Sequence, residues 1–555
     1  MKTKIQKAIT AACIELFGQD ISIELSRPDE QFGDYSTNVA LQLSKQLEKN
    51  PREIAEALAT RIQSDLTELI SHVDVAGPGF LNLTLTDQAL LSLREVKPQQ
   101  TLAGRNVVAE YSDPNPFKVL HAGHLYTSVV GDSIANLLET AGATVHRVNF
   151  GGDVGLHVGK TLWAILRELG GENPEKLQEI EEQKRSEWMA SCYVTGTNAY
   201  EDDVPAQVEI VSLNKRVYQI HAEEDHESAL AQIYWTCRQW SYDYFDAFYE
   251  TIGSRFEKYY PESSVSELGL QTVKAHQDDG IFEASDGAVI FRGEPYGLHT
   301  RVFVNRDGIP TYEAKDVGLI MQKWEDYHFD RSIVITGNEQ EQYMAVVLKA
   351  IEQFNPELIA ATTHLTHGIV KLKGGVKMSS RKGNILRAVD VLEVARDANR
   401  QLTGKDDQDT VLGAVKYAFL KNRLGGDIVY DPEESVSIEG NSGPYLQYAH
   451  ARARSILSKS PAANEAILDL EDQERSLLRK ITEYPEVLDK AIAELMPHLV
   501  STYLYELAQT FNRFYEHNRV IDDPRQNNRI QLVEWYATVL KDGLRILGIV
   551  APEQM

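Results

Sequence analysis

Two histidines in a four-residue segment suggest a phosphate-binding site. The segment is HAGH, residues 121–124, and it follows a turn that contains two prolines. Imidazole groups donate hydrogen bonds to phosphate oxygens as charge develops on a transferring phosphorus. Gly123 has no side chain, so a flat base can lie against its backbone, and Lys118 adds a positive charge upstream. We therefore predict that His121 and His124 are catalytic and that Lys118 and Gly123 help to bind the same ligand.

A second segment, KMSSRKGN at residues 377–384, is rich in cations. Lys377, Arg381 and Lys382 lie close together with glycines on both sides, and we predict that all three are catalytic. Such a loop can close over a triphosphate and hold the leaving pyrophosphate with charge-assisted hydrogen bonds. Neither segment is specific alone, because HAGH can be an accidental helix cap and an isolated basic segment is more often a solvated turn.

The first segment lies where a strand gives way to a helix. Residues 107–111 form a β-rich run, and apolar residues recur at helical spacing from 124 to 141. Residues 144–150 are strand-like again, and 332–335 form a later apolar strand. A strand–helix–strand unit builds a parallel, doubly wound sheet, which binds ligands beyond the carboxyl ends of its strands. The start of the helix also offers free N–H groups and a positive dipole end, which favour phosphate.

The length of 555 residues predicts several domains. The first part combines helical patterns at 2–17 and 36–69 with an alternating strand pattern at 80–85. The stretch of about 170–280 is mixed and acidic, and we expect a helical insertion there. From about Asp407 the pattern is mostly helical. The expected boundaries are 1–96 for an N-terminal α/β domain, 105–395 for the sheet domain with its insertion, and 405–555 for a helical domain.

The composition narrows the class of protein. Apolar residues make up 43% and charged residues 25%, as in globular proteins. No apolar run reaches the ~18 residues of a membrane helix. Three distant cysteines without a CxxC motif argue against disulfides and a cysteine zinc site, so we expect the cytosol. The net charge of −26 argues mildly against a nucleic-acid partner, unless a local basic track is present.

The two segments stand in the order, and at the separation, that one Rossmann domain with insertions needs. Together they resemble the HIGH and KMSKS signatures of class I aminoacyl-tRNA synthetases, with Ala122 and Ser380 as departures. The resemblance implies adenylate formation from ATP and transfer to a tRNA 3′ end, with Mg²⁺ on the ATP phosphates and no metal site in the protein. The implied ATP-binding residues are Lys118, His121, Gly123, His124, Lys377, Met378, Ser379 and Ser380.

Over nearly the whole chain the pattern is similar to arginyl-tRNA synthetases. That resemblance implies an α/β protein with a class I Rossmann-type catalytic domain, a helical insertion, a small N-terminal α/β domain that contacts tRNA, and an all-α anticodon-binding domain. It implies L-arginine and tRNA(Arg) as partners, and we expect a monomer. The matching segments are residues 32–38, 77–80, 110–125, 150–155, 306–316 and 442–452.

A guanidinium presents fixed planar donors, so its pocket should offer carboxylates and flat acceptors. By the resemblance, Glu110, Tyr312 and Asp316 would grip the guanidinium. Asn115 and Gln340 would hold the amino-acid core, and Ser112 is expected beside them. The alternatives are a capped strand-end carboxylate at Glu110, an ordinary helix pair of Tyr312 with Asp316, and a solvated Gln340. The predicted arginine-binding residues are Glu110, Ser112, Asn115, Tyr312, Asp316 and Gln340.

The C-terminal helices carry aromatic residues and cations together, which can stack on bases and meet phosphates. The alternative, which we prefer for most of the aromatic residues, is a buried helix core beside a wet face. By the resemblance, the predicted tRNA-binding residues are Asn38, Tyr448, Arg452 and Tyr515.

Two other functions remain possible from the residues alone. Another nucleotidyltransferase with a HIGH-type site would not need the N-terminal and helical domains. A catalytically silent tRNA-binding protein would be expected to lose His124 or the basic segment, and both are present. A metal site from His299, His364 and His367 is disfavoured, because no further ligands cluster near them in the sequence.

Overall fold

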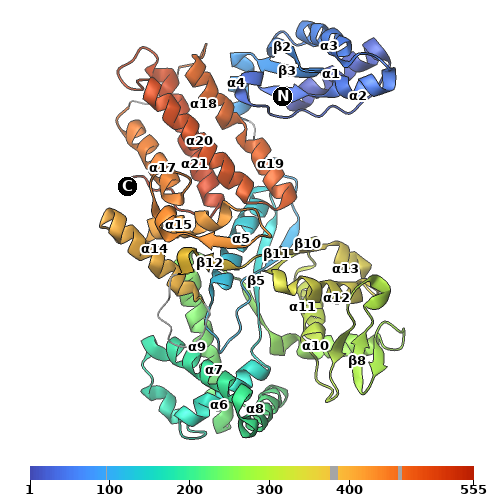
Figure 1. Ribbon diagram of the computed structural model, residues 1–555, viewed down its shortest axis with the longest axis vertical. Helices are drawn as coiled ribbons and strands as arrows, with labels where there is room; N and C mark the ends of the chain where they lie inside the picture. Colours follow the sequence, from blue (N-terminus) through green and yellow to red (C-terminus); the bar gives the residue numbers. More distant parts are fainter. Residues whose placement is uncertain (96, 376–385, 461–464) are drawn as a thin grey trace.

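A five-stranded parallel sheet lies at the centre of the chain. The structure is a computed structural model that describes residues 1–95, 97–375, 386–460 and 465–555. The strand order is β11-β10-β4-β5-β6, and every neighbouring pair runs parallel. In Figure 1 the sheet lies between the C-terminal helices above and the inserted helices below. The strands are β4 (Asn106–Glu110), β5 (Thr144–Gly151), β6 (Lys258–Pro261), β10 (Arg331–Gly337) and β11 (Thr362–His367).

The first strand and helix of this sheet follow the sequence pattern closely. The run 107–111 is β4, and the helical period that begins near His124 is α5 (Ala122–Thr140). Val107 and Val108 are fully buried, because helices and other segments cover both faces of a parallel sheet. HAGH therefore lies at the carboxyl edge of the sheet and begins α5, which confirms the predicted class I fold at this point.

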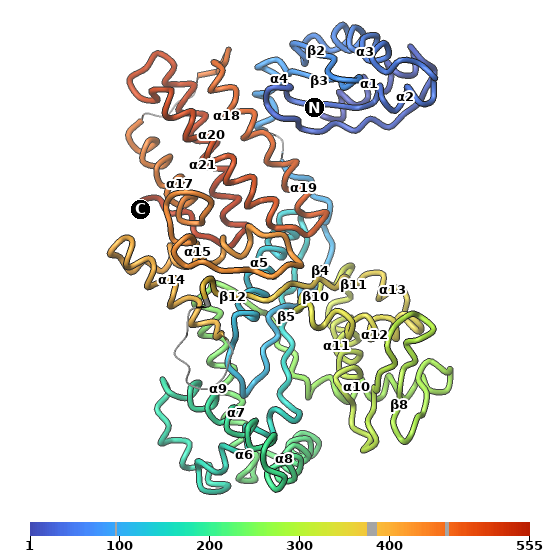
Figure 2. The backbone as a smooth tube through the Cα atoms, viewed as in Figure 1, coloured from blue at the N-terminus to red at the C-terminus, as the bar shows by residue number. Residues whose placement is uncertain are grey.

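The helical insertion extends below the sheet in Figures 1 and 2. Its helices pack around a core of their own. One strand within the stretch 170–280, β6, pairs with β5 and so belongs to the central sheet rather than to the insertion. Its sequence, KYYP, is too short and too polar to show a strand pattern. The inserted helices are α6 (Leu156–Glu168), α7 (Arg185–Asp202), α8 (Val204–Ala222) and α9 (Ala229–Ile252).

Three further helices and a small sheet surround β10 in the sequence. The antiparallel sheet β7-β8-β9 was not predicted, since its strands are only three or four residues long. The elements are α10 (Glu262–Ala275), β7 (Glu283–Ser285), β8 (Ala288–Phe291), β9 (Arg301–Val304), α11 (Tyr312–Tyr327) and α12 (Glu341–Glu352).

The N-terminal domain is a small α/β unit with an antiparallel sheet in the order β1-β3-β2. The helical pattern expected at 36–69 corresponds to two helices, and its first two residues belong to β1. Proline is favoured in the first turn of a helix and breaks a helix interior, so Pro51 starts a new helix, and the Asn50 side chain caps it by accepting the Arg52 N–H at 2.9 Å. The elements are α1 (Lys2–Phe17), β1 (Tyr35–Thr37), α2 (Val39–Leu47), α3 (Pro51–Asp65), β2 (Ile70–Ala76) and β3 (Phe80–Leu85).

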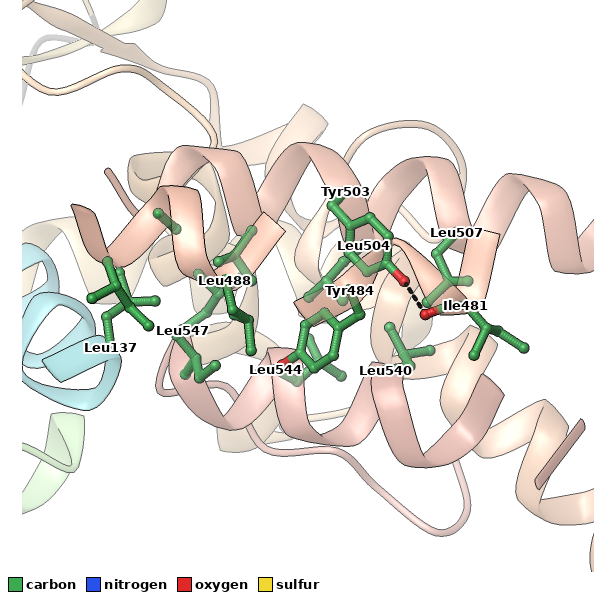
Figure 3. Close-up of a cluster of buried hydrophobic side chains, with 14 of the residues drawn as sticks. Leu137, Ile481, Tyr484, Leu488, Tyr503, Leu504, Leu507, Leu540, Leu544 and Leu547 are labelled. Atoms are coloured by element: carbon green, nitrogen blue, oxygen red, sulfur yellow. Dashed lines mark hydrogen bonds between the residues drawn. The ribbon is translucent and has the colours of Figure 1, made fainter. Parts of the chain in front are cut away.

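The C-terminal helices share their apolar core with the catalytic domain. Figure 3 shows leucines of these helices packed together with Leu137 of α5. Most C-terminal aromatic residues, including Tyr503, Phe511 and Phe514, are buried, as the sequence pattern indicated. No helix in the described part of the chain is long and apolar enough to cross a membrane. The helices are α15 (Gln408–Leu420), α17 (Gly443–Ser458), α18 (Asp472–Thr482), α19 (Tyr484–Glu494), α20 (His498–His517) and α21 (Gln526–Ile546).

The N-terminal domain contacts the C-terminal helices through charged hydrogen bonds. Arg475 of α18 donates to Asp34 at 2.6 Å and to Asp87 at 2.8 Å. Arg27 and Tyr35 both donate to Glu486 of α19 at 2.9 Å. Figure 1 shows the N-terminal domain beside α18 and α19. These contacts hold the N-terminal domain against the helical domain rather than against the sheet.

Tyr111, the residue after β4, fixes the strand end against α5. Its ring is fully buried and lies over Gly131 of α5, where any Cβ atom would overlap the ring. Its hydroxyl donates to Asp132 at 2.6 Å, and the Ser254 hydroxyl donates to the same carboxylate. The end of β4, the middle of α5 and the segment after α9 are therefore joined at one point.

We predict that Gly131→Ala lowers the melting temperature of the protein. Glycine to alanine in a helix ordinarily stabilises by about 0.5–1 kcal/mol, but overpacking against Tyr111 costs about 1–3 kcal/mol. Gly426→Ala is the control, because a Cβ there meets open space and its φ is not positive. Differential scanning calorimetry measures the shift. A Gly131→Ala protein that melts at or above the wild-type temperature would contradict the close packing of Tyr111.

Candidate active site

A strained turn follows β4 and forms one wall of the candidate site. Ser112, Asp113 and Phe117 have φ values of +76°, +51° and +66°, which residues other than glycine rarely adopt. Such conformations persist only where the surroundings enforce them. Here Ser112 and Tyr249 hydroxyls lie 2.7 Å apart in a hydrogen bond, and Asp113 accepts the Phe150 N–H at 2.8 Å. The turn is thus held by α9 and β5.

The two histidines of HAGH are neutral, and each has an Nε2–H group that can donate a hydrogen bond. His121 is the N-cap of α5, and its Nδ1 accepts the Gly123 N–H, while Nδ1 of His124 accepts the His121 N–H, both at 3.1 Å. The rings stack with centroids 3.7 Å apart. Burial lowers the pKa of both imidazoles, more strongly for His124, and nearby Lys118 lowers both further. Since Nδ1 accepts, the proton is on Nε2, so each ring offers an Nε2–H donor.

The carboxylates of Glu110, Asp113 and Asp316 meet at the end of β4. Glu110 and Asp316 are buried, and Asp113 is half-buried. The buried Lys323 ammonium of α11 donates to Glu110, and the Tyr343 hydroxyl of α12 donates to Asp316. Burial raises the pKa of Asp316 to about 7, and burial together with Glu110 raises the pKa of Asp113 well above its usual value. Lys323 is the cation that acts on all three carboxylates.

A second group of polar side chains converges on Gly152, just after β5. Asn115 Oδ1 accepts the Gly152 N–H at 2.8 Å. A Cβ at Gly152 would lie 2.7 Å from that oxygen, 3.2 Å from Glu262 Oε2 and 3.3 Å from the His157 ring. Glu262 is buried, and its Oε2 accepts no hydrogen bond from the described residues. Lys315 lies 3.4 Å from that oxygen, and burial raises the pKa of Glu262 to about 7.

Glu262 and His157 were not predicted from the sequence. His157 is the second residue of α6, and its Nε2 lies 2.7 Å from the Gly152 carbonyl oxygen, to which it donates. Burial lowers its pKa to about 3, so it is neutral. The available signal for His157 was its place two residues beyond the segment 150–155. Glu262 follows the short strand β6, whose pattern carried no signal, and only the parallel pairing of β6 with β5 brings it to the site.

Tyr312 and Gln340 come from two other elements, and Tyr312 lies near Glu262 and Lys315. Tyr312 begins α11 and is 56% exposed, and a Cβ at Gly155 would lie 3.8 Å from its hydroxyl. It therefore stands over the loop after β5, one helical turn before Asp316. Gln340 lies just beyond β10 and is exposed, with no hydrogen bond to another described side chain. Because β10 neighbours β4 in parallel, both strands end at the same edge.

The predicted loop residues Lys377, Met378, Ser379, Ser380, Arg381 and Lys382 lie outside the described residues. The described chain resumes at Leu386, whose carbonyl accepts the Ala122 N–H at 2.8 Å. Ala388 N–H donates to the Leu120 carbonyl at 2.9 Å, so residues 386–388 pair with the HAGH segment. The chain that follows KMSSRKGN is thus in contact with HAGH.

Three of the four predicted tRNA-binding residues lie on the helical domain. Tyr448 and Arg452 stand one turn apart on α17, and the Arg452 guanidinium lies 4.3 Å over the ring of Tyr515 from α20. Tyr448 is 43% exposed. Asn38 lies far from them in the chain, exposed at the start of α2, where it accepts a hydrogen bond from Gln42 at 2.7 Å.

The histidines considered as metal ligands have other partners or stand alone. His364 and His367 hydrogen-bond to Thr336 at 2.8 Å and Thr127 at 2.6 Å, whereas His299 is exposed. Within the ranges that the structure describes, no group of three His, Cys, Asp or Glu is placed to hold a metal.

A cavity of about 680 Å³ lies at the contact between the sheet domain and the C-terminal part of the chain. It is lined by Asp132, Arg147, Lys416 and Gly548 among others, and none of the predicted site residues borders it. The candidate site is therefore the group at the strand ends and not this cavity, because the residues predicted from the sequence converge at the strand ends.

The chain matches three family models in succession. Residues 1–85 match "Arginyl tRNA synthetase N terminal domain", 86–430 match "tRNA synthetases class I (R), catalytic domain", and 446–555 match "DALR anticodon binding domain". An arginine–tRNA ligase of Porphyromonas gingivalis is 28% identical over 603 aligned positions, covering 100% of this chain and 99% of that protein. An arginine–tRNA ligase of Streptococcus equi is 30% identical, with 93% of each chain covered.

The solved structures with a similar fold include arginyl-tRNA synthetases. The structure of the Thermus thermophilus arginyl-tRNA synthetase superposes with a TM-score of 0.79 at 25% identity and covers 100% of both chains. That of the Plasmodium falciparum enzyme gives a TM-score of 0.80 at 20% identity. The catalytic family model alone spans more than half of the 555 residues. With HAGH at the edge of the parallel sheet and helices at both ends of the chain, the protein belongs to the arginyl-tRNA synthetase family.

Proposed function

We propose that this protein activates L-arginine with ATP and transfers it to the 3′ end of tRNA(Arg). The observation that carries the proposal is the excess of negative charge at the end of β4. Among the described residues, the Lys323 ammonium is the cation that acts on all three carboxylates, Glu110, Asp113 and Asp316. Buried charges without partners are costly, so a cationic ligand is favoured there. A guanidinium supplies that charge with planar donors in a fixed arrangement.

The guanidinium would lie against Asp316, with Glu110 and Tyr312 beside it. Lys323 already donates to Glu110, which leaves Asp316 as the principal carboxylate for the ligand. Tyr343 orients the Asp316 carboxylate by donating to it. The exposed Tyr312 ring would cover the guanidinium from the solvent side, as aromatic faces do with cations.

The α-ammonium of arginine would meet Glu262 beside Gly152. The Glu262 Oε2 atom is buried and has the Lys315 ammonium 3.4 Å away as an ionic partner, and its second lone pair would accept a further cationic donor. Asn115 lies against the same glycine, and Gln340 stands at the neighbouring strand edge. Ser112 contributes by holding the turn, because its hydroxyl is engaged with Tyr249. The site would thus have one acidic region for each cation of arginine.

The ATP phosphates would lie at the start of α5. His121 and His124 each offer an Nε2–H donor, Gly123 leaves room for the base, and half-buried Lys118 adds charge. From the loop, Lys377, Arg381 and Lys382 would hold the pyrophosphate, with Met378, Ser379 and Ser380 lining ATP. Mg²⁺ would be carried by the ATP phosphates themselves.

Positioning and electrostatics would account for the first step. The carboxylate of bound arginine attacks the α-phosphorus of ATP, a P–O bond forms to the amino acid, and the bond to pyrophosphate breaks. Neutral Nε2–H donors at His121 and His124 stabilise the charge that develops on the phosphate oxygens. In the second step a ribose hydroxyl of the tRNA 3′ end attacks the arginyl carbonyl and AMP leaves.

The tRNA would be held by both ends of the chain. We propose Tyr448, Arg452 and Tyr515 as one contact, since an arginine stacked on tyrosine offers both a base-stacking face and a phosphate donor. Asn38 is proposed as a contact on the N-terminal domain. The domains would run over residues 1–96, 105–395 and 405–555. We propose that the protein is a monomer and that it is located in the cytosol.

We predict that ATP–pyrophosphate exchange, assayed with cognate tRNA present, is supported by arginine and not by citrulline. Citrulline has nearly the same shape, but its neutral urea group would leave the carboxylates of the pocket without a counter-charge. The other standard amino acids serve as controls. Exchange that citrulline or a neutral amino acid supports as well as arginine would sink the proposal.

A second prediction concerns Asp316. Asp316→Asn should raise KM for arginine by about 10- to 100-fold, the loss expected for a hydrogen bond to a charged group, and leave KM for ATP within about twofold. Asp278→Asn, an exposed carboxylate after α10, is the matched control and should match the wild type. Steady-state exchange kinetics measure both constants. Equal losses for arginine and ATP would remove Asp316 from the guanidinium site.

A further inference from the structure

Asp153 is a buried carboxylate that joins two segments next to the site. It follows Gly152 in the loop after β5 and is fully buried. Its carboxylate accepts the Ser263 N–H at 2.9 Å and the Ser263 hydroxyl at 2.7 Å. Ser263 is in the first turn of α10, whose own N-cap, Pro261, makes no side-chain cap. Asp153 therefore caps α10 from another segment, where a negative charge also suits the helix dipole.

Arg238 of the inserted helix α9 neutralises this carboxylate. Its Nε donates to Asp153 at 2.9 Å, and the guanidinium lies over the rings of Trp235 and Tyr242, at 5.3 and 4.9 Å. The Tyr234 hydroxyl of the same helix donates to the Asp153 backbone carbonyl at 2.9 Å. The insertion thus contacts both the side chain and the backbone of Asp153 in the loop after β5.

Asp153 connects the loop after β5 to the start of α10, and each of these two segments contains a residue of the candidate site. Gly152 precedes Asp153, and Glu262 precedes Ser263. We propose that Asp153 and Arg238 are positioning residues that fix Glu262 against Gly152 for recognition of the α-ammonium of arginine. This rests on the proposed function, and it gives the helical insertion a part in amino-acid recognition.

Charge gives this pair a signature that a purely structural role would lack. Glu262 binds a cation only when ionised, so kcat/KM for arginine falls as the pH drops through the Glu262 pKa, which burial raises to about 7. The charge on Asp153 raises that pKa and Lys315 lowers it. The titratable and charged groups that face Glu262 are Lys118, Asp153, His157, Tyr218, Tyr312, Lys315, Asp316 and Tyr343.

Opposite shifts are expected from the two partners. Asp153→Asn removes a negative charge near Glu262, so the acid limb of the kcat/KM profile should move to lower pH. Arg238→Gln leaves Asp153 uncompensated, so the limb should move to higher pH. Each shift should be on the order of half a pH unit or more in this buried setting. Arg238→Lys retains the charge and should restore the limb to near its wild-type position.

The experiment is arginine-dependent ATP–pyrophosphate exchange with tRNA present, from about pH 5.5 to 9, for these variants and the wild type. Arg216→Gln is the control, because it breaks an exposed ion pair with Glu172 on the same insertion. We expect kcat at high pH and tRNA affinity to stay within about twofold of the wild type, and we expect Arg238→Gln to raise KM for arginine several-fold at neutral pH.

Two results would overturn the proposal. One is an acid limb that lies at the same pH in Asp153→Asn, Arg238→Gln and the control Arg216→Gln. The other is a shift of both in the same direction, which would mark general loosening of the fold. If Asp153→Asn does not fold, the comparison of Arg238→Gln with Arg238→Lys decides alone. Inactive wild-type protein with arginine would instead contradict the proposed function, so the two failures are distinct.

Discussion

In the described part of the chain, the candidate site has more carboxylates than cations at the carboxyl end of β4. Three carboxylates are gathered there around the ammonium of Lys323, and burial raises the pKa of Asp113 and Asp316 instead of leaving them fully ionised. A protein that lacked a cationic ligand would gain by replacing such groups with apolar ones. The unfavourable arrangement is therefore understandable as preparation for a substrate that brings its own charge. The strained turn at Ser112 and Asp113 is consistent with that, since strain gathers where function requires it.

Contacts with the rest of the structure fix the position of the carboxylates at the end of β4. Tyr111 locks the end of β4 to α5, and Leu137 of α5 packs into the C-terminal helices, so the strand end and the helical domain share one core. The Asp153–Arg238 pair connects the insertion to the other side of the site. The insertion and the helical domain are therefore each connected to the strand ends or to α5, and the N-terminal domain is connected to the helical domain.

The sequence predicts what local pattern determines and misses what distant segments create. The apolar run of β4 and the helical period of α5 were long enough to place His121 and His124 correctly at the sheet edge. Glu262 was missed because the four-residue strand β6 brings it to the site, and β6 lies far along the chain from β5, its neighbour in the sheet. The Lys323 partner of Glu110 was missed for the same reason, since nothing in the sequence pairs residues on β4 and α11. The helical pattern expected at 36–69 corresponds to two helices, because a proline can begin a helix as well as end one.

The central claim is that arginine supplies the missing positive charge, and calorimetry tests it directly. Asp316 and Glu262 have pKa values of about 7, so at pH 7 each is about half protonated. A bound guanidinium and ammonium would lower both values and expel those protons. Titration of arginine into the protein at pH 7, in buffers of different ionisation enthalpy, measures the number of protons released. The account predicts a net release of protons when arginine binds, and binding of arginine with no net proton release would contradict it.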